Sequence, residues 1–504
     1  MPQVVFLNCP EAVAGELAQL NPTVRVLVVF APVDYGIHPE DQSPSIEIAD
    51  ETYDKVIVFS HAAVSGLDYR HPQCVDEIRS DKRVTTDAVS KFWRRWENFF
   101  RQTVDPEKLL LLRIPFQLFR GANDALNQAL EAGNLPRRFA FDCSFQVISS
   151  QQLAAAVRLA IEKRLSGVFN CAPPEVIRSS SLTGITGVRS RYWTGEGSGR
   201  MRGVPGLSAG WWKLFRYPCT LDSSRFEQAT GINWKSLPTL PGLDAGDDPF
   251  GLDPGTIRHT IWHRLAARKF WRLSVTGYTD IPKTGSAILI GPHRGFMPYD
   301  GVMMAYWMAV ERNRMPRYLV HHCLLRYPLL GQYIRRIGGM PACKENALRV
   351  LRNGEILAVF PEGIQGTFRY YRQTYTLGSF GRGDYLRWAL ETDSPILPYV
   401  CIGPQEAYPI FFKINWPWWK RTVEWPAFPI TATFPVIPLP MPTKWHFHFL
   451  APINARERFP GLEPEDERGI RKASKQIRAE LQNELLGLKA RRSNWFLGEL
   501  KPKA

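Results

Sequence analysis

Short apolar runs alternate with amphipathic stretches in the first part of the chain. The runs have the length and the Val, Ile and Leu content of buried strands, and they occupy residues 4–7, 24–30, 55–60 and 109–114. Patterns typical of helices lie between them at residues 12–20 and 84–101. Strands that alternate with helices predict an open α/β domain built on a parallel sheet.

The same alternation resumes in the second part of the chain. Apolar runs at 287–290 and 356–360 each end in a Gly- or Pro-containing turn, and residues 465–490 form an amphipathic helical pattern. Residues 242–255, which are dense in Gly, Asp and Pro, are typical of a linker. We therefore predict an α/β chain with two domains, residues 1–241 and 256–504.

The turn after the run at 287–290 carries the first candidate for chemistry. His293 follows Gly291-Pro292, and Asp300 stands seven residues further on, where a helical pattern begins. Gly295 and Pro298 argue against a continuous helix between them, but a loop that bulges there could still bring the carboxylate onto the imidazole. Imidazole, with its near-neutral pKa, suits a general base, and a carboxylate on its far nitrogen fixes the tautomer.

The second turn reads Phe360-Pro361-Glu362-Gly363. Together the two turns resemble the His-x4-Asp and Phe-Pro-Glu-Gly motifs of the glycerolipid acyltransferase superfamily, and the first is stretched to His-x6-Asp as in a bacterial branch of that family. Residues 337–347 and 395–400 resemble its intermediate and last blocks, in the same order. The resemblance implies an α/β acyltransferase domain in the second half of the chain.

The resemblance also implies a reaction and a set of site residues. The reaction is transfer of a fatty acyl group from acyl-CoA or acyl carrier protein to a hydroxyl of a lysophospholipid or related lipid, with no cofactor and no metal. The implied catalytic residues are His293, Asp300 and Glu362, and the implied substrate-binding residues are Arg294, Lys344, Gly363 and Arg369.

Two of the substrate-binding candidates concern a phosphate group. By the resemblance, Lys344 stands at the position of the family's phosphate-contacting arginine. The family often has another arginine two residues after the Glu-Gly pair, where this chain has Gln365, and Arg369 is the nearest substitute. This departure weakens the expectation that the acceptor is a lysophosphatidate.

Residues 1–240 resemble the extended short-chain dehydrogenase or nucleotide-sugar epimerase family, on the segments 59–66, 112–115, 167–172 and 221–226. A dinucleotide site needs glycines in the first strand-to-helix turn, because the pyrophosphate must reach backbone N–H groups there. In this turn Pro10 removes an N–H, Glu11 would repel a phosphate, and only Gly15 remains.

The catalytic Tyr-x3-Lys of that family is also missing, since Asp87 stands where the tyrosine would precede Lys91. We therefore expect a degenerate Rossmann-like, epimerase-like domain that binds no dinucleotide and serves for packing or for binding a partner. Residues 178–210, rich in Ser, Gly and Arg, predict a surface loop or flap.

Charge and cysteine content limit the binding partners and the cellular compartment that we expect. Of the formal charge of +15, the excess belongs to residues 256–504, which hold 36 Lys and Arg against 19 Asp and Glu. A basic surface attracts the phosphates of nucleic acid, acyl-CoA or an anionic bilayer, but no nucleic-acid-binding motif accompanies it. The eight cysteines form no Cys-x-x-Cys pair, which fits reduced thiols in the cytoplasm and no metal site. The segment His321-His322-Cys323 lies in an apolar run, which favours packing in the core over metal binding.

Two segments suggest a membrane surface. Ile257, Ile261 and Leu265 recur every four residues in the basic segment 256–273, which predicts one amphipathic helix that either lies on a bilayer or packs on its own domain. The segment 411–421 combines aromatic residues with three cations, and it either contacts lipid headgroups, covers an acyl groove or fills the core.

No spanning helix or signal peptide is expected. The apolar stretch 425–443 contains six prolines, and the chain opens on a strand-like run. We expect a peripheral protein on the cytoplasmic face of a membrane. Two other function classes remain open: an NAD(P)-dependent epimerase or reductase with an accessory acyltransferase, and a non-catalytic protein that binds lipid or acyl-CoA.

Overall fold

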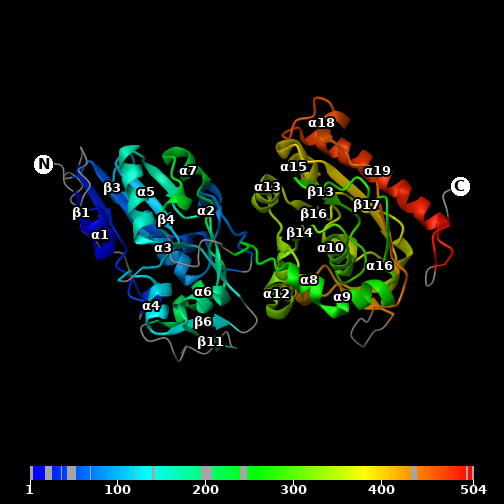
Figure 1. Ribbon diagram of the computed structural model, residues 1–504, viewed down its shortest axis with the longest axis horizontal. Coiled ribbons are helices and arrows are strands. Elements are labelled where there is room, and N and C mark those ends of the chain that lie inside the picture. The colour runs from blue at the N-terminus through cyan, green and yellow to red at the C-terminus, as the bar shows by residue number, and fades with distance from the viewer. Residues whose placement is uncertain are drawn as a thin grey trace. The chain divides into compact units, whose positions relative to one another are not determined.

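The chain divides into two compact units, Met1–Gly251 and Leu252–Ala504, in a computed structural model (Figure 1). The division falls inside the stretch 242–255 that the composition marks as a linker. The structure describes residues 4–17, 25–35, 37–42, 53–68, 70–119, 121–138, 142–193, 207–238, 247–432, 440–494 and 498–501. Each unit is α/β.

The first unit is built on a five-stranded sheet in which every neighbouring pair is parallel. In spatial order its strands are β1 (Val4–Leu7), β2 (Val26–Val29), β3 (Lys55–His61), β4 (Leu109–Ile114) and β9 (Gly167–Asn170). All residues of β2 and β4 are buried, as expected for parallel strands covered on both faces. The predicted strands at 4–7, 24–30, 55–60 and 109–114 are confirmed.

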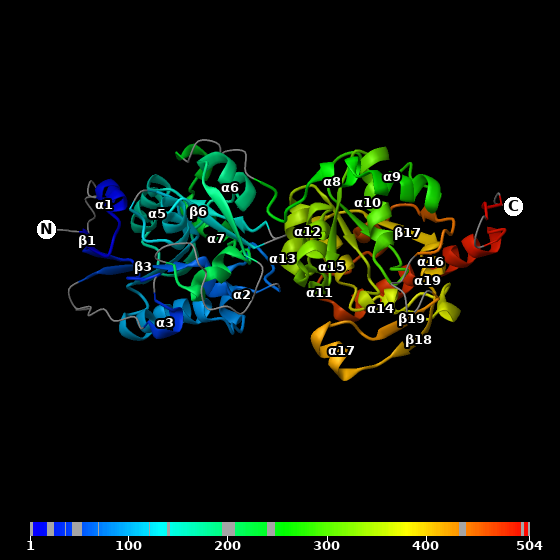
Figure 2. The same cartoon turned by 90° about the horizontal axis from the view of Figure 1, so that it is seen from below.

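Helices cover both faces of this sheet. Odd and even positions of a strand point to opposite faces, so Leu27 and Val28 enter different cores. One face packs on α3 (Ala88–Thr103), and the other on α1 (Glu11–Leu17), α5 (Ser150–Glu162) and α7 (Ser224–Thr230). Figure 2 shows α1 and α5 on one side of β3 and α3 on the other.

The remaining elements of the first unit are short. They are α2 (Glu77–Lys82), α4 (Ala125–Glu131), α6 (Ser179–Thr186), β5 (Phe116–Gln117), β6 (Asn134–Arg138), β7 (Ser144–Phe145), β8 (Val147–Ile148), β10 (Ile177–Arg178) and β11 (Arg189–Trp193). The predicted loop at 178–210 is therefore wrong for residues 179–193, because Asp142 holds the start of α6 through Ser179 and Ser180 and β11 pairs with β6. Residues 194–206 of that loop lie outside the described residues.

The second unit is built on a seven-stranded sheet. In spatial order its strands are β12 (Ser274–Thr276), β20 (His446–Phe449), β17 (Ile396–Ile402), β13 (Ala287–Ile290), β16 (Ile356–Val359), β14 (Pro316–Val320) and β15 (Gly339–Pro341). The five strands from β17 to β15 are parallel, whereas β20 runs antiparallel to β17. Parallel strands bring the residues that follow them to one edge of the sheet.

Helices cover both faces of the second sheet as well. Ala287 and Leu289 face a core shared with α10 (Tyr299–Glu311) and α8 (Pro254–His259), while Ile288 and Ile290 point to the opposite face. In Figure 1, α13 (Lys344–Arg352), α15 (Asp384–Thr392) and α19 (Glu467–Arg491) lie on that opposite side. The helix predicted at 465–490 is confirmed as α19, in which Ile470, Ile477, Leu481 and Leu488 are buried.

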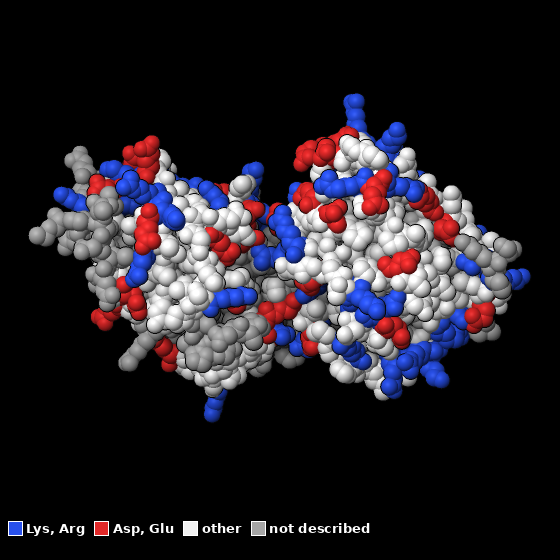
Figure 3. Space-filling model, turned by 45° about the horizontal axis from the view of Figure 1, so that its top comes forward, with Lys and Arg blue, Asp and Glu red and all other residues white. Residues whose placement is uncertain are grey.

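The other elements of this unit connect the strands. They are α9 (Ile261–Leu265), α11 (His322–Arg326), α12 (Pro328–Arg336), α14 (Ile364–Thr367), α16 (Pro404–Ala407), α17 (Pro417–Thr422), α18 (Ala455–Arg458), β18 (Ile410–Ile414) and β19 (Phe428–Thr431). Figure 3 shows clusters of Lys and Arg on one face of the second unit, where the sequence has its basic excess.

The single amphipathic helix predicted at 256–273 is wrong. Thr260 has an extended backbone that separates α8 from α9, and a π-helical turn follows at Ala266–Phe270. Ile257 is fully buried, whereas Ile261 and Leu265 are 64% and 50% exposed, because the break turns α9 away from the core that α8 enters. No helix among the described residues is long and apolar enough to cross a membrane, and residues 433–439 of the proline-rich stretch lie outside them.

Candidate active site

The candidate site lies at the carboxyl ends of two neighbouring strands. β13 pairs in parallel with β16, and the turns that follow these strands carry His293 and Glu362 respectively. The sheet therefore brings together two motifs that are 69 residues apart in the chain. Asp300 completes the set from the first turn of α10, where it is fully buried.

His293 and Asp300 form a hydrogen-bonded pair. Nδ1 of His293 lies 2.9 Å from Oδ2 of Asp300. The backbone N–H of Arg294 donates to the same oxygen at 2.7 Å, and the N–H of Gly301 donates to Oδ1 at 2.8 Å. The carboxylate is thus held at three points, and it orients the imidazole so that Nε2 is the nitrogen left for a substrate.

A bulged loop makes this pair possible across seven residues. Gly295 has φ of +86°, a conformation that side-chain-bearing residues rarely adopt. A Cβ at this position would also lie 2.8 Å from the carbonyl oxygen of Pro404. The glycine allows the loop to pass close to α16 and return to Pro298, which caps α10.

His293 is packed at its ring by Phe360 and at its backbone and Cβ by Gly366. Its ring stacks on Phe360, with centroids 4.0 Å apart and planes inclined by 15°. Gly366 of α14 approaches so closely that a Cβ there would lie 2.9 Å from the His293 carbonyl oxygen and 3.1 Å from its Cβ. Packing of this kind locks a catalytic side chain in one orientation.

Glu362 is buried in an ion pair with Arg294. Nη2 of Arg294 lies 3.2 Å from Oε1 of Glu362, and both side chains are 2% exposed. The N–H of Gly378 donates to Oε2 of Glu362 at 2.7 Å, and Arg294 also donates to the carbonyl oxygen of Thr376 at 3.1 Å. The pair ties the turn after β16 to the loop after β13, and it places Arg294 in the interior.

The three other site residues predicted from the sequence lie at different places relative to this pair. Gly363 lies beside the cavity described below and caps α14 with φ of +58°. Nη1 of Arg369 lies 4.0 Å from Oε2 of Glu362, and burial lowers the pKa of this arginine. Lys344 begins α13, is 58% exposed and pairs with Glu391 at 2.7 Å, so the structure does not bring it to the cavity.

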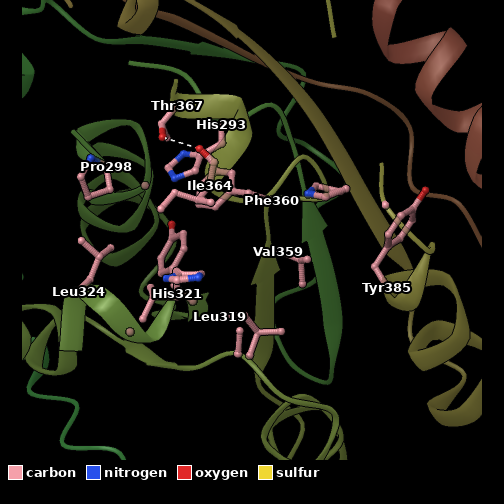
Figure 4. A pocket seen from close by; sticks show the side chains of 18 of the residues that line it. His293, Pro298, Leu319, His321, Leu324, Val359, Phe360, Ile364, Thr367 and Tyr385 are labelled. Atoms are coloured by element: carbon pink, nitrogen blue, oxygen red, sulfur yellow. Dashed lines mark hydrogen bonds between the residues drawn. The ribbon is translucent and has the colours of Figure 1, made fainter. Parts of the chain in front are cut away.

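His293 lines a largely apolar cavity of about 330 Å³ (Figure 4). The view shows His293 and Ile364 at one end and Leu319 at the other, with Leu324 and Val359 on opposite sides. Its charged lining residues are Arg382 and Asp384. A wall of this composition suits an apolar ligand, as in most small-molecule pockets, which are lined mainly by apolar side chains.

Sequence reasoning missed several polar residues of this cavity, among them Tyr318 and His321. Tyr318 packs on Phe360 with ring centroids 6.0 Å apart, and its hydroxyl has no hydrogen-bond partner among the described residues. Burial, reinforced by the Asp300 charge, raises its pKa well above the usual value. His321 lines the cavity and caps α11, so the prediction that it packs in the core is wrong. Its position directly after β14, the strand next to β16, was the signal that it lies at the same sheet edge as the site.

The turn after β1 in the first unit contains the residues on which the expectation of no dinucleotide binding rests. Asn8 has φ of +54° and Glu11 stands in the first turn of α1. The cavity at the ends of β1, β3 and β4 measures about 20 Å³, which is room for about one water molecule. Asp87, at the expected tyrosine position, caps α3 by accepting the N–H of Ser90.

Comparison with known proteins agrees with this site. Residues 272–402 match the family model described as Acyltransferase. An uncharacterized protein of Mycobacterium tuberculosis is 32% identical over 265 residues, which are 51% of this chain and 73% of that protein. The chain therefore belongs to the acyltransferase family through its C-terminal half, as the motifs indicate.

More distant relatives have named activities or solved structures. The 1-acyl-sn-glycerol-3-phosphate acyltransferase of Borreliella burgdorferi is 29% identical over 155 residues, which are 28% of this chain and 54% of that protein. The acyltransferase PlsC of Thermotoga maritima is 21% identical and has a TM-score of 0.32, over 46% of this chain and 80% of that structure. A dTDP-4-dehydrorhamnose reductase ortholog of Clostridium acetobutylicum is 15% identical and has a TM-score of 0.33, over 49% and 98% respectively.

Proposed function

We propose that the chain transfers a fatty acyl group from an acyl thioester to a hydroxyl of a lipid acceptor, with His293 as the general base. The observation that carries this proposal is the His293–Asp300 pair at the end of an apolar cavity. Nε2 of His293 takes the acceptor proton while the hydroxyl oxygen attacks the thioester carbonyl carbon. The C–O bond forms, the C–S bond breaks, and the imidazolium returns its proton to the leaving thiolate.

Asp300 and the Glu362–Arg294 pair have supporting roles in this mechanism. The buried carboxylate of Asp300 keeps the proton on Nδ1 and stabilises the imidazolium that forms. Glu362 and Arg294 fix the two catalytic turns relative to each other, so that the acceptor binds close to Gly363. Arg369 is the cation nearest to Glu362 after Arg294 and is our candidate for the acceptor or donor phosphate.

The apolar cavity and the named relatives support a lipid as the acceptor. A lysophospholipid such as 1-acylglycerol 3-phosphate is the first acceptor to test, because the Borreliella burgdorferi relative is named for that substrate. Acyl-CoA and acyl carrier protein are the two donors to compare. Because the proposed substrates are lipids, we propose a peripheral location at the cytoplasmic face of a membrane. No step of the proposed reaction needs a bound cofactor.

Thiol release from palmitoyl-CoA by the purified chain tests the proposal. The acceptors are a panel of lysophospholipids, monoacylglycerol and long-chain alcohols, dispersed in detergent. The proposal predicts release that depends on one acceptor class and a product of the matching mass. No release from either donor would contradict it and favour a non-catalytic lipid-binding protein, whereas release that is independent of every acceptor would contradict it and indicate thioester hydrolysis.

A further inference from the structure

Large aromatic side chains are exposed on a two-stranded hairpin outside the second sheet. Strands β18 and β19 pair antiparallel and carry α17 between them, and we call residues 410–431 the aromatic hairpin. Four of its large side chains are exposed: Phe411 by 47%, Phe412 by 70%, Trp416 by 49% and Trp418 by 65%. Four exposed large aromatic residues within eight positions of the chain are more apolar surface than a protein usually leaves facing water without a partner.

The aromatic hairpin is also basic. Lys413, Lys420 and Arg421 lie in it, against one acidic residue, Glu424, whose side chain is 15% exposed. Lys420 and Arg421 are exposed on α17, while Lys413 lies over the ring of Tyr370 at 4.2 Å. Trp beside Lys and Arg matches the headgroup layer of an anionic bilayer, where each cation adds about 1 kcal/mol of attraction.

The inner side of the aromatic hairpin is anchored at the cavity. Trp419 of α17 packs on Trp425, with ring centroids 5.9 Å apart. Trp425 lines the cavity and packs in turn on Phe296 at 5.2 Å. Nη1 of Arg326, at the end of α11, donates to the carbonyl oxygen of Thr422 at 2.6 Å, which fixes the hairpin beside the cavity wall.

A second surface with exposed apolar and basic residues lies elsewhere on this unit. Ile261 and Leu265 of α9 are exposed, with Arg264 between them. Figure 2 shows α9 and α17 on opposite sides of the unit, so one flat bilayer cannot contact both. The aromatic hairpin reaches the cavity directly, because Trp419 packs on Trp425 and Trp425 lines the cavity.

We propose that the aromatic hairpin is the surface by which this unit binds an anionic phospholipid bilayer. Phe411, Phe412, Trp416 and Trp418 enter the interfacial layer, and Lys420 and Arg421 contact lipid phosphates. The inference rests on the proposed function in one respect: a lipid substrate passes from the bilayer into the cavity at Trp425.

Vesicle co-sedimentation of the full chain tests this inference. The vesicles contain either phosphatidylcholine alone or equal amounts of phosphatidylcholine and phosphatidylglycerol. The variants are Phe412→Ser with Trp418→Ser, and Lys420→Glu with Arg421→Glu; Ile261→Ser with Leu265→Ser on α9 is the matched control. We expect preference for the anionic vesicles, a loss of affinity of about tenfold or more in each hairpin variant, and wild-type binding by the control.

Several outcomes would overturn the inference. They are equal binding of wild type and hairpin variants, loss of binding in the α9 control alone, or hairpin-dependent capture of an acidic acyl carrier protein with no binding to vesicles. The variants replace exposed side chains, and an unchanged melting temperature shows that they fold. Thiol release by the wild-type chain from detergent-dispersed substrates needs no vesicle, so failure of the proposed function is distinguished from failure of this inference.

Discussion

The carboxylate of Asp300 is the most constrained group of the site. Fully buried, it accepts from the Arg294 and Gly301 N–H groups as well as bonding the His293 ring. A buried carboxylate with this many partners is stable only as part of a network, because an unpaired charge in the interior is costly. The sequence could name both residues, but not the loop geometry that joins them across seven positions.

Asp300→Asn tests the orienting role at this position. The amide fills the same space but presents an N–H or a weaker acceptor to Nδ1, so it favours the wrong tautomer of His293. We expect kcat for acyl transfer to fall by about a hundredfold to ten-thousandfold with KM little changed. Asp393→Asn, on a surface carboxylate 72% exposed, is the control and should keep wild-type kcat. An unchanged kcat with an altered KM would contradict the role.

A buried carboxyl in the first unit makes a prediction about pH. Burial raises the pKa of Asp124 from 3.8 to about 7, and it lowers the pKa of the neighbouring His61 from 6.5 to about 3. Because the folded chain binds the Asp124 proton more tightly than the unfolded chain, this carboxyl stabilises the fold below about pH 4, and that contribution is lost as the pH rises through 7. Each unit of pKa difference corresponds to about 1.4 kcal/mol.

Asp124→Asn keeps a neutral side chain at every pH and retains an acceptor to cap α4. The difference in melting temperature between variant and wild type should therefore grow from near zero at pH 4 to a clear gain at pH 8. Scanning calorimetry across this range measures it. A variant less stable than wild type at pH 8 would show that the ionised carboxylate is favourable in its site.

At the scale of elements, the strand ends and the helices that follow them position the chemistry. The order of β13 and β16 in the sheet brings two distant turns together, and α14 then packs against His293 through Gly366. Apolar runs were enough to predict these strands, because a strand buried on both faces is recognisable from its own residues. The break at Thr260 was not predictable from periodicity, since α8 and α9 keep the same spacing on either side of it.

Two glycine substitutions separate close packing from helix propensity. Gly366→Ala places a Cβ 2.9 Å from the His293 carbonyl oxygen, so it should displace the imidazole and lower kcat. Gly487→Ala on α19 meets nothing within 4 Å and should stabilise the second unit by about 1 kcal/mol with unchanged kcat. Kinetics and melting temperatures of both variants check this, and full activity of Gly366→Ala would show that the contact does not position His293.

At the scale of the molecule, the two units have the same layered α/β plan but differ at the strand ends. The second unit carries a large apolar cavity there, whereas the first has Pro10 and Glu11 in its first turn and a cavity of about 20 Å³. The fold class of both halves was predictable from alternating patterns. The cavity was not, because its wall comes from side chains of many separate elements, among them Tyr318, His321 and Trp425.

The first unit should bind no nicotinamide dinucleotide. Glu11 would repel a pyrophosphate at the start of α1, and the cavity at the strand ends has no room for a nucleotide. Titration of the full chain with NADH or NADPH, followed by calorimetry and by cofactor fluorescence, should give no saturable signal. Stoichiometric binding of either dinucleotide would contradict this and support the epimerase or reductase alternative.

The central claim is that His293 is the base of an acyl transfer. The most direct measurement is the rate at which a labelled acyl group passes from its thioester to the best acceptor, in wild type, His293→Ala and His321→Asn. We predict a loss of about a hundredfold or more for His293→Ala and a much smaller effect for His321→Asn, which lines the same cavity and retains a helix cap. Wild-type transfer by His293→Ala would contradict the mechanism.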